Sequence, residues 1–196
     1  YRRARCRTGR EMKEVVRDMV SVIVSAYNAE NYLGSAIESL LHQDYLGPME
    51  IVICDDCSSD HTLEVALSAA RENAQVKVLS TMANSGAAFA RNMCVSNSSG
   101  AYLMVHDADD LSSPNRVSAL VSALDRHQDV SFVGSAISLF DDRGAYGSWS
   151  AKHAAPTKWS FLPGLPFCHP ACMFRREAFL EVGGYRVAPE TRRGQD

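Results

Sequence analysis

The feature that most constrains the fold is a regular alternation of short β-branched runs with longer segments of helical spacing, beginning near residue 20. Continuous apolar runs of this length predict buried strands, and apolar side chains three and four residues apart predict helices. Strands are expected at residues 20–26, 49–54, 76–80 and 101–106, with helices at 30–43, 62–71 and 85–95 between them. Such alternation with short connections is typical of right-handed βαβ units and a mainly parallel sheet.

The second half of the chain is expected to be less regular. Ser113-Pro114 is predicted to open another helix, with proline at an early position where its missing N–H does no harm. Residues 130–140 indicate one longer strand or a pair of strands, and residues 175–185 a helix stopped by glycine. No internal repeat interrupts the pattern, so we expect a single domain over residues 20–196 after a basic linker or tail at residues 1–19.

Composition and charge narrow the function classes. The chain has 196 residues, 46% of them hydrophobic, which suits one globular core, and it contains no apolar run long enough to cross a membrane. Residues 1–18 carry seven basic and three acidic side chains, whereas the other 178 carry thirteen basic and twenty acidic ones. An acidic body argues against binding to a phosphate backbone, and the basic head lacks interleaved aromatic residues, so no nucleic acid is expected as a partner of the core domain.

The ends of the chain and its cysteines give weaker guidance. The sequence begins with Tyr1 and stops at Asp196 with no obvious closing element, so we expect a piece of a longer protein, truncated at the C-terminus. No secretory signal is visible. Six cysteines do not form the dense framework of a small secreted scaffold, so reduced thiols and a cytoplasmic location are the default expectation.

Polar residues follow each predicted strand, which is where open parallel sheets bind ligands. The strand-end segments are S-A-Y-N at 25–28, D-D-C-S at 55–58, A-N-S-G at 83–86 and D-A-D-D at 107–110. Up to five carboxylates therefore share one rim, and they repel one another unless a cation offsets them. Hard oxygen ligands suit Mg²⁺ or Mn²⁺, which share their remaining positions with water and phosphate. Acidic residues after strands also cap helices, which is our interpretation of Asp60, but D-A-D-D supplies more carboxylates than a cap needs.

The C-D-D-C segment at residues 54–57 raises a separate alternative, a redox or zinc dithiol. Lowering a thiol pKa needs positive neighbours, and Asp55 and Asp56 act in the opposite direction. Zinc would need a second pair, and the C-H-P-A-C run at 168–172 does not give a standard pairing with C-x-x-C. We therefore interpret the sulfur as incidental and the carboxylates as functional.

The sequence also shows a family resemblance. Five ordered segments carry it: V-S-V-I-V-S-A-Y-N-A-E-N-Y-L, E-I-V-I-C-D-D-C-S-S-D-H-T, N-S-G-A-A-F-A-R-N, G-A-Y-L-M-V-H-D-A-D-D and H-P-A-C-M-F-R-R-E-A-F-L-E-V-G-G-Y-R. The sequence resembles a family 2 glycosyltransferase domain from about residue 20 to 196. The resemblance implies a GT-A fold, an α/β architecture with a Rossmann-like, mainly parallel sheet flanked by helices and a less regular acceptor-side second half. It also implies an inverting, metal-assisted enzyme that moves a sugar from a nucleoside-diphosphate sugar, expected to be a UDP-sugar, to an acceptor hydroxyl.

The resemblance also implies a donor site. Tyr27 matches the aromatic residue that packs on the nucleotide base, and Asp56 the acid that hydrogen-bonds it, with Asp55 and Ser25 beside them. Arg91 stands where the family often has a basic residue near the pyrophosphate.

The D-A-D-D segment matches the metal-binding motif of the family. Asp107 corresponds to the first carboxylate, near ribose and metal, and Asp109 to the principal ligand of Mn²⁺ or Mg²⁺. Asp110 is expected to support them or to cap the next helix.

The acceptor side is implied by the later segments. Asp196 matches the catalytic base, although Gln195 replaces the usual glutamate before it, and His169 lies in the acceptor-lining segment. Arg175 and Arg176 would bind phosphate or cap a loop. The acceptor itself, whether glycan, lipid, protein or small molecule, is not indicated.

Two other interpretations stay open. Gln195 is compatible with a non-catalytic domain that binds a nucleotide sugar without turning it over. A sugar nucleotidyltransferase is a third interpretation, but the segment after the first predicted strand lacks the glycine- and lysine-rich phosphate loop such enzymes carry.

Overall fold

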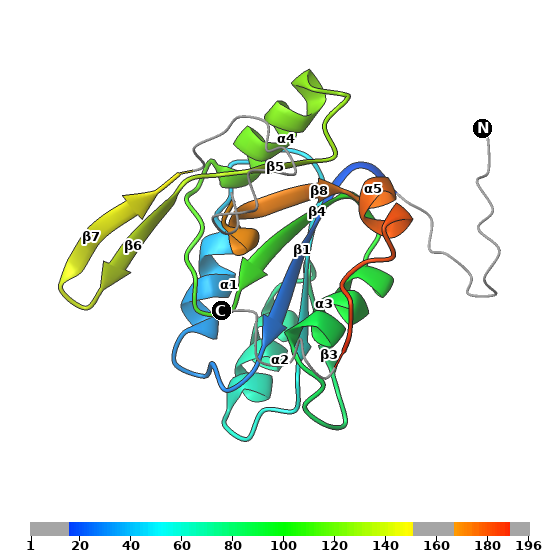
Figure 1. The fold of residues 1–196 in the computed structure, drawn as a ribbon. Helices are drawn as coiled ribbons and strands as arrows, with labels where there is room; N and C mark the ends of the chain where they lie inside the picture. The colour runs from blue at the N-terminus through cyan, green and yellow to red at the C-terminus, as the bar shows by residue number, and fades with distance from the viewer. Residues whose placement is uncertain (1–15, 151–166, 189–196) are drawn as a thin grey trace.

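The computed structural model describes residues 16–150 and 167–188 and shows a mixed sheet covered by helices on both faces (Figure 1). The strands are β1 (Val16–Ala26), β2 (Met49–Asp55), β3 (Val76–Ser80), β4 (Gly100–Asp107), β5 (Phe132–Gly134), β6 (Ile137–Asp141), β7 (Gly144–Trp149) and β8 (Cys172–Arg175). The helices are α1 (Leu33–Leu41), α2 (Thr62–Glu72), α3 (Ala87–Ser96), α4 (Arg116–Arg126), α5 (Arg176–Glu181) and the short 3₁₀ helix η2 (His169–Ala171).

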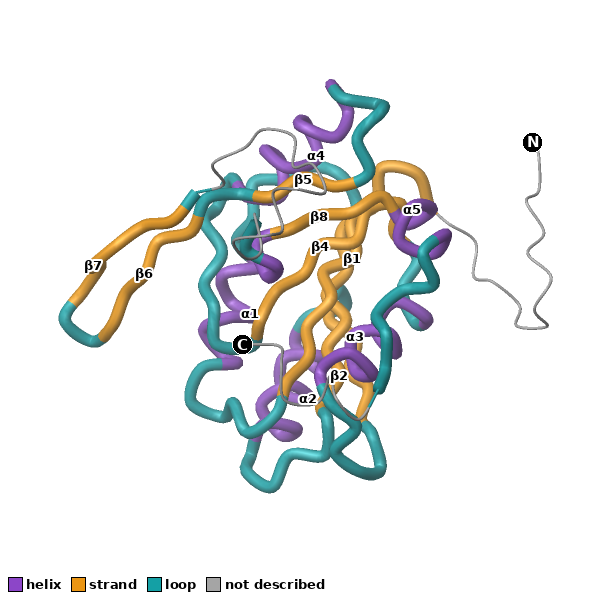
Figure 2. Tube along the Cα trace, viewed as in Figure 1, coloured by secondary structure: helices purple, strands orange, loops and turns teal. Residues whose placement is uncertain are grey.

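The main sheet has six strands in the order β3-β2-β1-β4-β8-β5. Strands β1 to β4 are mutually parallel, as the alternation predicts, whereas β8 runs antiparallel to both β4 and β5. β6 and β7 form a separate two-stranded hairpin that projects from the body of the domain (Figures 1 and 2). The mainly parallel α/β fold is therefore confirmed, with an antiparallel edge that the sequence pattern does not predict.

Two apolar layers flank the sheet, because its strands are buried on both faces. On one face the buried residues of α1, α2 and α4 pack against alternate β1 positions such as Val22 and Val24. On the other face Ile23 and Cys54 pack against α3 and against Phe179 of α5. Right-handed connections place α1 and α2 on one face because β1, β2 and β3 follow in one direction, and they place α3 on the other face because the chain returns past β1 to β4.

Several element boundaries differ from the sequence expectation in small ways. β1 begins at Val16, four residues before the predicted strand and the predicted domain start, and the Val16 amide donates to the Ser99 carbonyl at 2.9 Å. Pro114 precedes α4 instead of lying inside its first turn. Residues 130–140 contain a pair of strands, and α5 stops at two glycines with φ of +85° and +76°, as expected.

A buried polar network closes the sheet at the amino ends of the parallel strands. Burial alone would raise the pKa of the Glu50 carboxyl, but hydrogen bonds from Lys77, Ser21 and the Ser99 amide together lower it. A side chain at Gly100 would lie 2.5 Å from the Met19 carbonyl oxygen, so the chain needs glycine there. Hydrogen bonds and close packing therefore fill this end of the sheet, and the opposite rim, at the carboxyl ends of the strands, is left for a ligand.

Among residues 16–150 and 167–188, no helix is long and apolar enough to cross a membrane.

Candidate functional site

The carboxyl ends of β1, β2 and β4 lie level with one another. Ser25 of β1 is in register with Cys54 on one side and with Asp107 on the other, and Ala26 is in register with Asp55. Tyr27, directly after β1, is half-exposed at this rim. The structure therefore brings together the strand-end residues that the sequence singles out, because parallel strands in register end at one edge.

Asp56 holds the loop that leads into α3. Its carboxylate accepts hydrogen bonds from the Thr81 hydroxyl at 2.9 Å, the Ser85 amide at 2.9 Å and the Gly86 amide at 2.7 Å. Gly86 adopts φ of +87°, where a side chain would be strained. Asp56 is thus a positioning residue for the 84–86 loop, and its predicted contact with a nucleotide base stays a prediction.

The C-D-D-C segment places its two thiols in different surroundings. Cys54 is fully buried in the α3-side core, whereas Cys57 is exposed in a turn with φ of +61°. Non-glycine residues adopt this conformation at a cost of about 1–3 kcal/mol. Asp55, beside them, is buried, and its Oδ1 has no hydrogen-bond partner among the described residues. The other oxygen, Oδ2, accepts a hydrogen bond from the Ser58 amide at 3.2 Å, so one oxygen of this carboxylate stays available to a ligand.

The other cysteines are also placed by packing. Burial is the main reason that the pKa of Cys94 lies well above its ordinary value, and burial raises the pKa of Cys172 to about 12. The Cys172 thiol donates to the Cys168 carbonyl at 3.2 Å. These thiols are held as neutral core groups.

Among the residues that the structure describes, Asp107 has an ion-pair partner and Asp109 has none. Asp107 accepts a hydrogen bond at 2.7 Å from Arg91, whose side chain is nearly buried. Asp109 is exposed at the rim. Burial, followed by the charges of Asp107 and Asp109, raises the pKa of Asp110 to about 6, while Arg116 opposes the shift. Three carboxylates thus lie at one strand end, where burial and the two neighbouring charges disfavour the ionised form of Asp110.

Arg91 lies between Asp107 and a tyrosine from a distant segment. Its guanidinium carbon lies 5.8 Å from the ring centroid of Tyr185, in cation–π range. The side chain of Asn92 binds both backbone polar groups of Tyr185: Nδ2 donates to the Tyr185 carbonyl at 2.8 Å, and Oδ1 accepts from the Tyr185 amide at 3.0 Å. Asn92 and Arg91 therefore connect the A-R-N segment to the G-G-Y segment next to the carboxylates. Because Arg91 also binds Asp107, it is a positioning residue for that carboxylate in this structure.

His169 lies on the Arg91 side of the site. Burial, followed by the charge of Arg91, lowers its pKa to about 4, so the ring is neutral. The Tyr185 hydroxyl and Nε2 are joined by a hydrogen bond of 2.8 Å, and the two rings make an edge contact with centroids 5.4 Å apart. Its predicted role on the acceptor side stays a prediction, but its neighbour Pro170, not His169, lines the cavity described below.

Arg175 and Arg176 cap loops, which was one of the two predicted roles. Arg175 donates to the carbonyls of Leu124 at 2.6 Å and Val130 at 2.9 Å, at the end of α4 and beyond. Arg176 donates to the Val95 carbonyl at 3.1 Å, at the end of α3. Both arginines lie away from the strand-end carboxylates, so their position does not support the other predicted role, binding of phosphate.

Two residues that the sequence reasoning missed lie directly under the carboxylates. Burial, with the charge of Arg116, lowers the pKa of His106 to about 4, and its Nδ1 donates to the Asp107 carbonyl at 2.7 Å. Arg116 donates to the carbonyls of Val105 at 3.0 Å and Pro170 at 2.5 Å. Arg116 thus connects β4 to η2. The one sequence hint was its position three residues after Ser113, where a helix is predicted to begin.

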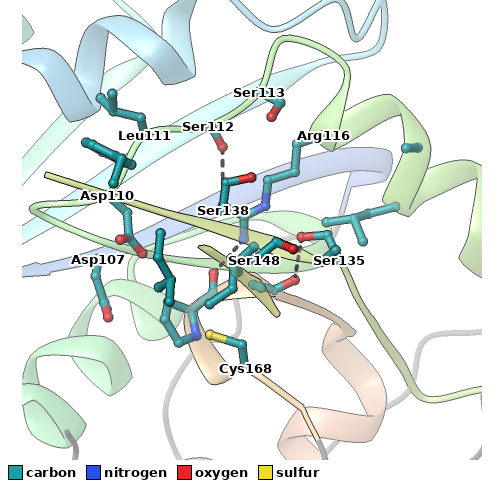
Figure 3. Close-up of a pocket in the computed structure, with 18 of the residues that line it drawn as sticks. Asp107, Asp110, Leu111, Ser112, Ser113, Arg116, Ser135, Ser138, Ser148 and Cys168 are labelled. Atoms are coloured by element: carbon teal, nitrogen blue, oxygen red, sulfur yellow. Dashed lines mark hydrogen bonds between the residues drawn. The ribbon is translucent and has the colours of Figure 1, made fainter. Parts of the chain in front are cut away.

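A cavity of about 700 Å³ opens beside Asp107, Asp109 and Asp110 (Figure 3). Its other walls are the start of α4, the β6–β7 hairpin and the Cys168–Ala171 segment. Figure 3 shows Arg116, Ser138 and Ser148 around this space. The cavity is within the size range of small-molecule sites, about 300–1,000 Å³.

Asp60 and Asp196 are the other two acidic residues to which the sequence assigns a role. Asp60 accepts a hydrogen bond from the Thr62 amide at 3.0 Å, which confirms it as a cap of α2. Asp196, the predicted catalytic base, lies outside the described residues.

The D-A-D-D segment fits a metal ion that is shared with a ligand. In the part of the chain that the structure describes, no group of three or more His, Cys, Asp or Glu side chains could hold a metal by itself. Mg²⁺ and Mn²⁺ commonly take only one or two carboxylates and complete their shell with water and substrate phosphates. Asp109 is exposed next to Asp107, so these two carboxylates suit an ion of this kind.

Solved structures identify the class of fold. The domain resembles TarS 1-349 of S. aureus, with 26% identity, a TM-score of 0.65 and coverage of 85% of this chain and 49% of that one. It also resembles the mannosyltransferase PcManGT of Pyrobaculum calidifontis in complex with GDP-Man and Mn²⁺, at 20% identity and a TM-score of 0.65, over 86% of this chain and 47% of that one. By its fold the domain is a GT-A glycosyltransferase.

Sequence comparison identifies the family. The model of glycosyl transferase family 2 matches residues 21–183, and the chain belongs to that family. EpsE of Bacillus subtilis (strain 168) is 36% identical over 178 residues, 90% of this chain, and the chain spans 63% of EpsE. The Escherichia coli enzyme WfgD, named UDP-Glc:alpha-D-GlcNAc-diphosphoundecaprenol beta-1,3-glucosyltransferase, is 30% identical over 155 residues, 79% of this chain and 58% of WfgD.

Proposed function

We propose that the protein transfers a sugar from a nucleoside-diphosphate sugar to an acceptor hydroxyl with inversion at the anomeric carbon. The observation that carries this proposal is the position of the D-A-D-D segment. On one side of this segment are the carboxyl ends of β1 and β2, which carry the residues predicted to bind the nucleotide. On its other side is the cavity. A donor bound across the first side would present its sugar to an acceptor bound in the second.

The donor side is built for a base and a diphosphate. The half-exposed ring of Tyr27 offers a stacking surface, and Asp55 offers a buried oxygen without a partner. Asp109 with Asp107 would hold Mn²⁺ or Mg²⁺, which would offset the negative charge of the diphosphate when bound. UDP is the proposed nucleotide because a TarS structure with a TM-score of 0.63 contains UDP and WfgD is named for UDP-Glc.

The acceptor step needs a base. We assign that role to Asp196, which would take the proton from the acceptor hydroxyl while its oxygen attacks the anomeric carbon and the diphosphate leaves. A single displacement of this kind inverts the configuration. A positioned general base contributes about 10²- to 10⁴-fold to the rate.

Calorimetry of UDP binding with and without Mn²⁺ tests the donor site. We expect UDP to bind in a Mn²⁺-dependent way, and we expect Asp109→Asn to abolish that dependence without changing the fold, since the exposed side chain contributes little packing. Asp142→Asn, exposed in the β6–β7 turn, is the matched control. Unchanged Mn²⁺-dependent affinity in Asp109→Asn would contradict the assignment.

A non-catalytic domain that binds nucleotide sugars is the second candidate, because Gln195 stands where the family has glutamate. A panel of UDP- and GDP-sugars, assayed for hydrolysis and transfer with Mn²⁺, separates the two. Normal UDP binding without turnover of any donor would favour the binding domain.

A further inference from the structure

The D-A-D-D segment belongs to a short span, residues 106–111, that is held at both ends. At one end the span continues β4, whose last residue is Asp107. Directly after the other end, the Ser112 amide donates to the Ser39 hydroxyl of α1 at 3.0 Å. The span turns between these ends, where the Asp110 amide donates to the Asp107 carbonyl at 3.3 Å. The position of the carboxylates therefore depends on how the two ends are held relative to each other.

One arginine binds the residues on both sides of this span. Arg116, at the start of α4, donates from Nη2 to the Val105 carbonyl of β4 at 3.0 Å and from Nη1 to the Ser112 hydroxyl at 3.2 Å. Ser112 and Arg116 lie close together on the wall of the cavity (Figure 3). A guanidinium is planar and holds its N–H donors in a fixed arrangement. Arg116 therefore fixes the two ends of the span relative to each other.

The place of Arg116 follows from the end of strand pairing between β4 and β8. β8 pairs with β4 from Tyr102 to Met104. The next carbonyl along β4, that of Val105, accepts from Arg116, and so does the Pro170 carbonyl, which lies just before β8. Backbone carbonyls inside a fold need a donor, and a long side chain with several donors serves two of them at once. Arg116 thus fills the fork where β8 leaves β4, and the first carboxylate of the span follows two residues farther along β4.

The charge of Arg116 also acts on the span. Its three acceptors, two backbone carbonyls and one hydroxyl, are uncharged. Burial and the charges of Asp107 and Asp109 raise the pKa of Asp110, and the positive charge of Arg116 opposes that rise. Arg116 therefore influences the span through its geometry and through its charge, and substitution by lysine separates the two contributions.

We propose that Arg116 is a positioning residue for the metal ion: by holding both ends of the 106–111 span, it keeps Asp107 and Asp109 in the arrangement that binds Mn²⁺ or Mg²⁺. Arg116 acts through the backbone of the span and not as a ligand. The part played by the metal rests on the proposed function, whereas the hold on the span rests on the contacts of Arg116 alone. Residues that orient metal ligands commonly change metal affinity by about 10- to 100-fold when they are substituted.

Titration of Mn²⁺ at a fixed UDP concentration, followed by calorimetry of the full chain, tests this role. Arg116→Gln removes both the charge and the donor geometry, so it should weaken the apparent affinity for Mn²⁺ by about tenfold or more, while UDP affinity in EDTA stays unchanged. Arg116→Lys keeps the charge without the fixed arrangement of donors, so it should not restore the affinity. Unchanged Mn²⁺ affinity in Arg116→Gln, or full recovery in Arg116→Lys, overturns the proposal.

Arg175→Gln is the matched control. Arg175 also donates to backbone carbonyls, those of Leu124 at 2.6 Å and Val130 at 2.9 Å, but it lies away from the strand-end carboxylates. The variant should melt at a lower temperature, as Arg116→Gln should, and should keep the Mn²⁺ affinity of the unmodified protein. An equal loss of Mn²⁺ affinity in Arg175→Gln would mean that reduced stability explains the effect, and it overturns the proposal.

A milder pair of variants decides the question if both Arg116 variants fail to fold. Ser112→Ala removes the hydroxyl that Arg116 binds after the span and should weaken the apparent affinity for Mn²⁺ by about two- to tenfold. Ser98→Ala is its control, because the Ser98 hydroxyl accepts from Arg176 at 2.7 Å, away from the carboxylates. In that case, no change in Ser112→Ala, or an equal change in Ser98→Ala, overturns the proposal.

Hydrogen exchange of the metal-free protein separates this proposal from the proposed function. The amides of residues 107–112 should exchange faster in Arg116→Gln than in the unmodified protein, and at an unchanged rate in Arg175→Gln. If the unmodified protein does not bind UDP in a Mn²⁺-dependent way, the proposed function is contradicted, and the exchange rates alone decide whether Arg116 holds the span. Unchanged exchange in Arg116→Gln overturns the proposal even where Mn²⁺-dependent binding of UDP is normal.

Discussion

The two sides of the D-A-D-D segment are built in opposite ways. On the side of β1, β2 and β3, strand ends are in register and Asp56 fixes the neighbouring loop through hydrogen bonds to side-chain and backbone donors. On the other side the β6–β7 hairpin has no strand partner in the main sheet among the described residues, and Leu139, Phe140 and Tyr146 are largely exposed. A two-stranded hairpin is marginally stable by itself. The comparison indicates that the side proposed for the donor is preorganised, whereas the side proposed for the acceptor has few packing constraints on its sequence.

The largest expected effect separates the two sides chemically. Asp196→Asn should lower kcat by about 10²- to 10⁴-fold and leave UDP affinity unchanged, because a base acts only on the acceptor. Transfer assays beside calorimetry of UDP binding check this. Retained turnover would assign the base to another residue and would weaken the division of the site into donor and acceptor sides.

Core stability should differ between the two sides. Ile53→Ala in β2 removes a fully buried side chain and should lower the free energy of unfolding by about 2–5 kcal/mol. Phe140→Ala in the hairpin, where the ring is 50% exposed, should change it by about 0.5 kcal/mol or less. Urea denaturation of the two variants measures both values. Similar losses would show that the hairpin is an integral part of the folded core.

A smaller effect is expected where the two sides meet. Tyr185→Phe removes the hydroxyl that is hydrogen-bonded to His169 and should change acceptor turnover by about two- to tenfold while UDP affinity stays within error. Tyr146→Phe, 68% exposed in the hairpin, is the control for loss of a hydroxyl. A lower UDP affinity in Tyr185→Phe instead would assign the tyrosine to the donor side through Arg91.

The last effect concerns the burial of Asp110 beside the charges of Asp107 and Asp109. The folded pKa of Asp110 is about 6, above its ordinary 3.8, so between these values the folded state binds more protons and its stability falls as pH rises. Asp110→Asn removes this loss, so in EDTA the variant should melt at a higher temperature than the unmodified protein at pH 7. The difference should disappear near pH 4, and a variant that is less stable at pH 7 would contradict the assignment.

Sequence reasoning succeeded where structure follows from local periodicity. The strand at Val76–Ser80 has the predicted bounds, and the register of β1 with β2 and β4 gathers the predicted residues because the strands are parallel. The cap at Asp60 and the glycine stop of α5 are confirmed for the same reason. The strand bounds, the cap and the glycine stop depend on residues close together in the chain, and the parallel direction of the strands follows from the helical connections between them.

Long-range partners were not predictable in the same way. β8 enters the sheet antiparallel between β4 and β5, and its four residues are too few to show a period. The partners of Arg91 are Asp107 and Tyr185, 16 and 94 positions away, and a sequence pattern gives an arginine no direction. The role of Arg116 as a tie between β4 and η2 was missed for that reason.

By itself, the sequence determined the order of elements, the parallel half of the sheet and the cluster of carboxylates at its rim, because side-chain period and chain connectivity dictate all three. Only the tertiary structure decided which carboxylate is neutralised, which thiols are buried and where the cavity opens. Those properties depend on distances between segments far apart in the chain, and in a buried site such distances set both charge and solvation. Asp107 is paired with Arg91, whereas Asp109 is exposed and has no partner within residues 16–150 and 167–188, so two residues of the same type differ in chemistry.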